Sequence, residues 1–74
     1  MTVSKGELLY YIFESEEGVT VDDAANWYGV DKDDMKAKLE KFCEEGLVDK
    51  KEKWRGMIYT ITDKGFKELQ YYVI

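Results

Sequence analysis

"AANWYGVDKDDMKAKLEKFCEEGLVDK", residues 24–50, decides how the chain folds, because two glycines and an aspartate divide it into two helices and an extended stretch. Gly29 ends the first helix, since glycine enters the left-handed region without steric cost. Asp31 offers an N-cap for the second helix, and Gly46 ends it. The stretch therefore predicts two helices joined by a turn of three or four residues.

The second of these helices, over 32–45, has one apolar and one charged face. Four side chains fall within a narrow arc and predict a surface packed in the core: Met35, Leu39, Phe42 and Cys43. Cys43 is interpreted as a small buried hydrophobe. The opposite face is acidic overall and comprises Asp33, Asp34, Ala37, Glu40, Lys41 and Glu44.

Upstream, two further N-caps predict two helices. Ser4, with Glu7 three residues later, forms a capping box for a helix that ends near Gly18, and Thr20 caps a helix over 21–28. The expected core stripe of the first helix is Leu8, Leu9, Ile12 and Phe13. The dipeptide "VT" at 19–20 is long enough only for a single bridging strand.

Downstream, the pattern changes to a hairpin and a last helix. Two extended stretches, 47–53 and 57–62, flank "WRG" and predict a hairpin with Gly56 at its tip. Thr62 caps a helix over 63–72, whose Phe66 and Leu69 are expected to return to the core. The chain has room for one domain, 1–74.

Composition limits the chemistry. With no histidine and one cysteine, a zinc site, an internal disulfide or a histidine-based catalytic triad lacks its ligands or base, so we expect no enzyme, no metal and no cofactor. Neither a membrane span nor a secretory signal is recognisable, which predicts a cytoplasmic protein. The net charge of -5 is unevenly distributed, because residues 1–31 hold seven carboxylates against one base.

The order of elements resembles the winged helix-turn-helix family of small archaeal and bacterial transcriptional regulators. Ala25 four residues before Gly29, "EEGLV" at 44–48 and "YTITDKG" at 59–65 are similar to that family's turn, its exit into the wing and its strand-to-helix junction. The resemblance covers the whole chain. It implies an α+β fold with a three-helix core, a short strand, a two-stranded β-hairpin wing and a short C-terminal helix.

The resemblance also implies duplex DNA as the partner, with the helix over 32–45 in the major groove and the wing beside it. The implied nucleic-acid-binding residues are the basic flanks of that helix and the basic wing: Lys32, Lys36, Lys38, Lys50, Lys51, Lys53, Trp54 and Arg55. The wing is the stronger candidate, since four bases face one acid, Glu52, within six residues. Ala37 stands where the family often has an arginine.

Purely structural interpretations compete with several of these binding roles. Asp33 and Asp34 favour the positive end of a helix as readily as they accept a hydrogen bond from cytosine. Lysines 36 and 41 each precede a glutamate by four residues, which suits ordinary surface ion pairs. Trp54 either contacts a ligand or folds back over Met57 and the lysine stems.

The aromatic residues leave two further alternatives. At least one of Trp27 and Tyr28 is expected in the core. The C-terminal "ELQYYVI" is either the last strip of the core or a homodimer contact with the first helix. The candidate dimer residues are Tyr10, Tyr11, Tyr71, Tyr72 and Ile74.

Two functions follow. The first is a DNA-binding regulator that uses the helix over 32–45 and the basic wing over 50–56. The second is a protein-protein interaction module, in which an acidic surface and an exposed tryptophan or tyrosine anchor meet a basic partner.

Overall fold

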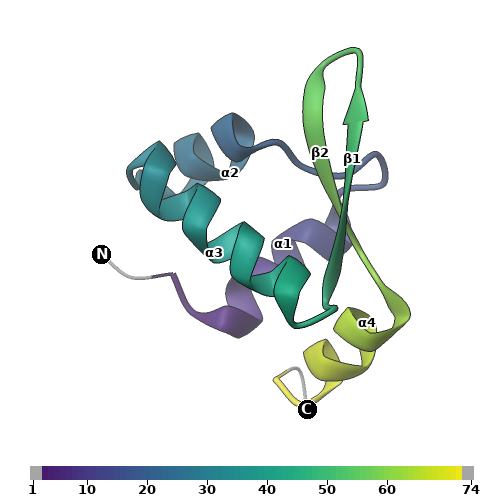
Figure 1. The fold of residues 1–74 in the computed structure, drawn as a ribbon. Coiled ribbons are helices and arrows are strands. Elements are labelled where there is room, and N and C mark those ends of the chain that lie inside the picture. The colour runs from purple at the N-terminus through teal and green to yellow at the C-terminus, as the bar shows by residue number, and fades with distance from the viewer. Residues whose placement is uncertain (1–2, 73–74) are drawn as a thin grey trace.

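The computed structural model describes residues 3–72, and it is an α+β fold in which four helices accompany one antiparallel β-hairpin (Figure 1). The elements in chain order are α1 (Lys5–Glu14), α2 (Val21–Tyr28), α3 (Lys32–Glu44), β1 (Val48–Lys53), β2 (Gly56–Ile61) and α4 (Asp63–Gln70). The α+β class and the order of elements expected from the sequence are confirmed.

All four helices begin at the N-caps expected from the sequence. Each cap side chain accepts a hydrogen bond from a backbone N–H of its helix's first turn, which satisfies a donor that the helix itself leaves free. The bonds run from Glu7 to Ser4, from Asp23 to Thr20, from Asp33 to Asp31 and from Gly65 to Thr62, at 2.9 to 3.2 Å. In the first of these caps, the Glu7 carboxylate accepts from the Ser4 hydroxyl at 3.1 Å.

The hairpin extends beyond the helices at one end of the molecule, opposite α4 (Figure 1). Its strands pair from Val48 with Ile61 to Lys53 with Gly56, so Trp54 and Arg55 form the two-residue tip. Gly56 takes a φ of 106° as the first residue of β2, rather than standing at the tip itself. Near the base of the hairpin, Val19 forms an isolated antiparallel bridge with Tyr59. The sequence predicted a single bridging strand at 19–20 but not its partner.

The core lies where α1, α3 and the hairpin base meet. Its buried members are Val3, Leu8, Leu9, Ile12, Val19, Ala24, Ala25, Met35, Leu39, Phe42, Leu47, Val48, Tyr59 and Leu69. α2 packs on α3, while α4 packs on α1 and β2. The core therefore fixes the base of the hairpin to α3 and leaves its tip outside.

Thr62 joins the start of α4 to the turn after α3. Its backbone N–H and its hydroxyl both donate to the Leu47 carbonyl, at 3.0 Å each, and the hydroxyl also lies 2.7 Å from the Gly46 carbonyl. Gly65 sits directly over the same carbonyl, because a Cβ built on it would lie 2.1 Å from the Leu47 oxygen. The close approach of α4 to this turn therefore depends on a glycine.

Two expected core aromatics are exposed instead. Phe13 is 45% exposed and Phe66 is 41% exposed, and their rings pack on each other with centroids 5.3 Å apart. The prediction failed because both residues lie at the margins of their helices' apolar arcs, where neighbouring elements cover them incompletely. Cys43 is likewise half-buried at the edge of the core.

Two predicted helices are also too long. α1 stops at Glu14, because the Ser15 backbone is extended, rather than near Gly18. α4 ends at Gln70 rather than at residue 72. Among residues 3–72, no helix has both the length and the apolar character needed to cross a membrane.

Candidate nucleic-acid interface

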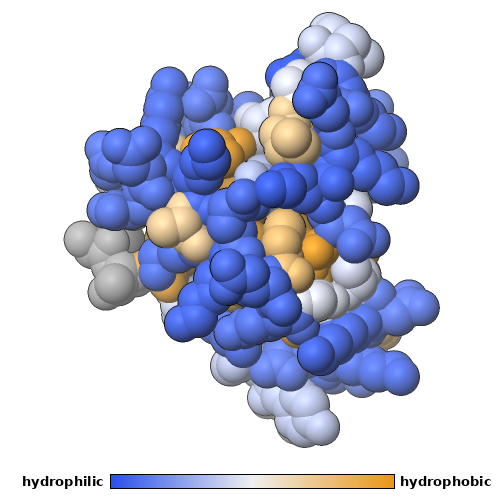
Figure 2. All heavy atoms as spheres, viewed as in Figure 1, coloured by the Kyte–Doolittle hydropathy of each residue, from blue (hydrophilic) through white to orange (hydrophobic). Residues whose placement is uncertain are grey.

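A groove runs between α3 and the hairpin and contains several of the predicted site residues. Its cavity of about 370 Å³ is lined by Val21, Lys32, Asp33, Lys36, Glu40, Lys50, Met57 and Tyr59. Figure 2 shows this face of the molecule as mostly hydrophilic, with small apolar surfaces between the hairpin and the helices. Three lysines and two carboxylates share the lining, so the groove itself has almost no net charge.

Lys50 turns toward α3 rather than toward solvent. Its ammonium lies 2.8 Å from Glu40 Oε1, and the hydroxyl of the buried Tyr59 donates to Glu40 Oε2 at 3.1 Å. The Lys50 ammonium, assisted by the Tyr59 hydroxyl, holds the pKa of Glu40 below its usual value. Burial, followed by the bond to Glu40, raises the pKa of Tyr59 to about 12. This triad fastens the middle of the hairpin to α3.

Two more predicted bases are paired with α2. Arg55 at the hairpin tip lies 3.3 Å from the Asp23 carboxylate, and Lys32 at the start of α3 lies 3.3 Å from the Asp22 carboxylate. Both pairs are largely solvent-exposed, so each contributes little to the free energy of unfolding. Their importance is electrostatic: the acids at the start of α2 neutralise two bases expected to meet DNA.

Lys51 and Lys53 lie on the other face of the hairpin. Successive side chains alternate between the two faces of a strand, so these lysines share a face with Ile58, and Lys50 shares the opposite face with Tyr59. Both lysines are exposed, and neither has a carboxylate within ion-pair distance among residues 3–72. They are therefore available to an anionic ligand.

Trp54 projects from the hairpin tip with 92% of its surface exposed. This exposure contradicts the interpretation in which the ring folds back over Met57 and the lysine stems. A two-residue tip held by strand pairing up to Lys53 and Gly56 leaves the indole no neighbouring surface to cover. Trp54 is free to contact a partner.

The two remaining predicted lysines of α3 line different cavities. Lys36 lies in the groove, whereas Lys38 lines a different cavity, between α3 and the start of α1. Lys38 therefore does not share a surface with the hairpin. The two predicted helical ion pairs are also wrong, because Glu40 is taken by Lys50 and Glu45 by Lys5.

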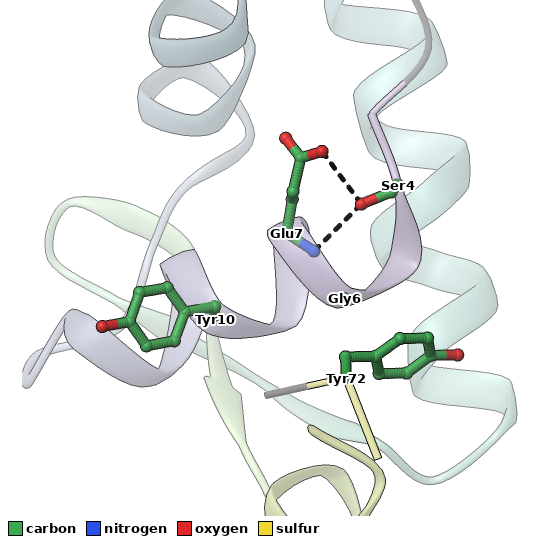
Figure 3. A pocket seen from close by; sticks show the side chains of 5 residues that line it. All are labelled: Ser4, Gly6, Glu7, Tyr10 and Tyr72. Carbon is green, nitrogen blue, oxygen red and sulfur yellow. Dashed lines mark hydrogen bonds between the residues drawn. The ribbon is translucent and has the colours of Figure 1, made fainter. Parts of the chain in front are cut away.

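Three of the predicted dimer residues line two cavities that share Tyr10. Tyr10 and Tyr72 line a cavity of about 370 Å³ with Ser4, Gly6 and Glu7, and their rings point away from each other (Figure 3). Tyr11 is half-buried and turns toward α2, and Tyr71 is exposed. Ile74 lies outside the described residues.

Trp27 and Tyr28 form a second aromatic cluster with Tyr11. Trp27 is 70% exposed and stacks on Tyr11 with ring centroids 5.8 Å apart and planes 14° apart. Tyr28 packs against the core, meets Tyr11 edge-on, and donates from its hydroxyl to the Glu7 carbonyl at 3.0 Å. The expectation that at least one of the two residues lies in the core is therefore met only in part, because Tyr28 is half-buried at the edge of the core.

Reasoning from the sequence did not identify the acids that pair with the predicted bases. Asp22, Asp23 and Glu40 lie 10 to 32 residues from their partners, so spacing along a helix could not reveal these contacts. Comparison with protein-family models, with curated proteins and with solved structures gives no match.

Proposed function

We propose that this chain is a winged-helix protein that binds duplex DNA, of the kind found in transcriptional regulators, with the hairpin as its wing and main contact. The observation that carries the proposal is the exposed hairpin end, where, within the described part of the chain, Lys51 and Lys53 have no acidic partner and lie beside the exposed Trp54. Bases that project from a body reach phosphates, and an exposed indole can lie on sugar or base surface.

α3 has the smaller role in this proposal. Its first turn presents Asp33 and Asp34 beside Lys32 and Lys36, so the approach of its outer face to phosphate is opposed as well as favoured. The acidic remainder of the molecule repels DNA and would orient the hairpin toward it. We therefore expect weak binding with limited sequence preference.

Titration of a fluorescently labelled duplex of about 20 base pairs, followed by anisotropy at low and at physiological salt, tests the proposal. The double variant Lys51→Ala/Lys53→Ala should weaken binding about tenfold and lower the salt slope by about two, one for each lost phosphate contact.

The matched control for this titration is Lys64→Ala/Lys67→Ala. It removes the same charge from exposed positions on α4, at the end of the molecule opposite the hairpin tip. If the two double variants behave alike, the hairpin is not the contact. If the parent protein does not bind even at low salt, DNA binding is excluded.

The ion pair between Arg55 and Asp23 leads to a second prediction, in which a variant binds DNA more tightly than the parent protein does. Asp23→Asn keeps the shape of the side chain but releases Arg55, so it should strengthen DNA binding about threefold and steepen the salt slope by about one. The same titration measures both effects. Asp63→Asn, in the first turn of α4, is the control with equal charge change, and an equal gain from it would contradict a specific release of Arg55.

A further inference from the structure

A cleft between α1 and α2 has the chemistry of a cation site. Its cavity of about 490 Å³ is lined by Glu7, Tyr10, Tyr11, Glu14, Ser15, Trp27 and Tyr28. Four of these seven side chains are aromatic, two are carboxylates, and none is basic. Such a lining excludes anions and favours a positively charged group, because aromatic faces and carboxylates both attract cations.

The aromatic rings are held in place by contacts within the cleft. Tyr11 is half-buried at its centre, with Trp27 stacked on its face and Tyr28 against it edge-on. Because the Tyr28 hydroxyl is engaged by the Glu7 carbonyl, that ring cannot turn freely. The aromatic cluster is therefore preorganised, and most of the surface of Trp27 is exposed and available to a ligand.

A carboxylate lies near each of the three tyrosines of the cleft. Glu14 raises the pKa of Tyr10 above its usual value. Burial, together with a carboxylate nearby, raises the pKa of Tyr11 and of Tyr28, the carboxylate being Asp23 for the first and Glu7 for the second. Glu16 and Glu17, which are both exposed, follow Ser15 in the chain.

We propose that the α1–α2 cleft binds an arginine side chain from a basic segment of a partner protein, with the guanidinium on the exposed surface of Trp27 and neighbouring bases near the exposed acids Glu16 and Glu17. A planar guanidinium stacks on an indole and at the same time donates to carboxylates. Two further exposed acids, Glu16 and Glu17, follow Ser15 in the chain, and this charge complementarity favours a basic peptide over an isolated small cation. No hairpin residue lines this cleft, and the proposal does not rest on DNA binding, although Asp23 lies near both Tyr11 and Arg55.

The two tryptophans allow a direct test. Trp54→Phe leaves Trp27 as the single indole, so its fluorescence reports occupancy of the cleft. Titration with a synthetic peptide of alternating arginine and glycine should change the emission saturably, whereas the same peptide with citrulline in place of arginine should leave it unchanged. The absence of a saturable change up to millimolar arginine peptide would overturn the proposal. So would equal binding of the citrulline peptide.

Variants then assign the binding to the cleft. In the Trp54→Phe background, Glu14→Gln should weaken binding about fivefold, and Glu44→Gln, which changes the net charge equally on α3, should leave it within twofold. Trp27→Ala, followed by calorimetry, should also weaken binding about fivefold. Equal losses from Glu14→Gln and Glu44→Gln would mean attraction by net charge alone and would overturn the assignment. Binding of free arginine amide as tight as that of the peptide would identify a small-molecule site instead.

Discussion

Gly65→Ala is expected to lower the free energy of unfolding by about 3 kcal/mol and the melting temperature by about 15 °C. The added Cβ would fall 2.1 Å from the Leu47 carbonyl oxygen and 2.8 Å from Ile61 Cγ1. The carbonyl cannot retreat easily, since Thr62 holds it through two hydrogen bonds. The helix must therefore move away from the α3–β1 turn, at the cost of its packing.

The sign of this effect distinguishes packing from helix propensity. Alanine is the better helix former by about 1 kcal/mol, so a position governed by propensity alone would be stabilised by the same substitution. Urea unfolding followed by circular dichroism measures the difference. Lys67→Ala, an exposed position in the same helix, should stay within about 0.5 kcal/mol of the parent. A neutral or stabilised Gly65→Ala protein would contradict the close contact.

Alkaline pH is expected to lower the free energy of unfolding through Tyr59. The pKa of this tyrosine is raised from 10.0 to about 12 in the folded state, so the folded protein holds the phenolic proton more tightly than the unfolded chain does. The resulting stabilisation is fully present below pH 10 and is lost as the pH rises toward 12. Two pKa units correspond to about 3 kcal/mol, of which about half is lost by pH 11.

Tyr59→Phe isolates this effect. The variant should be about 1 kcal/mol less stable than the parent at pH 7, because Glu40 loses a hydrogen-bond donor, but its stability should fall less steeply above pH 10. Urea unfolding at intervals from pH 7 to 11 gives both curves. Tyr71→Phe removes a hydroxyl from an exposed ring and should follow the parent. Parallel curves for the parent and Tyr59→Phe would show that Tyr59 is not the group responsible.

Local signals in the sequence predicted the elements well, because each depends on residues within one turn. Ser4, Thr20, Asp31 and Thr62 cap helices through bonds to backbone two or three residues away. These features need no knowledge of how distant parts of the chain pack.

Contacts between elements distant in the sequence were harder to predict. A helical wheel places Phe13 and Phe66 on apolar stripes, but how far each stripe is covered depends on where α1 and α4 cross. Likewise, the basic residues of the hairpin could be located from the sequence. The ion pairs of Lys50 with Glu40 and of Arg55 with Asp23 depend instead on how closely the hairpin approaches α3 and α2. The sequence therefore located the basic residues without showing which of them remain free.

The charges of β1 also bear on how copies of the protein meet in solution. Among residues 3–72, β1 pairs with β2 on one side only, which makes it a sheet edge with unpaired backbone groups. Such an edge can template the addition of a strand from a second molecule, and charged side chains, especially lysine, discourage it. Positions 49–53 are all charged. Whether or not this charged run binds a ligand, it disfavours aggregation through the open edge of the hairpin.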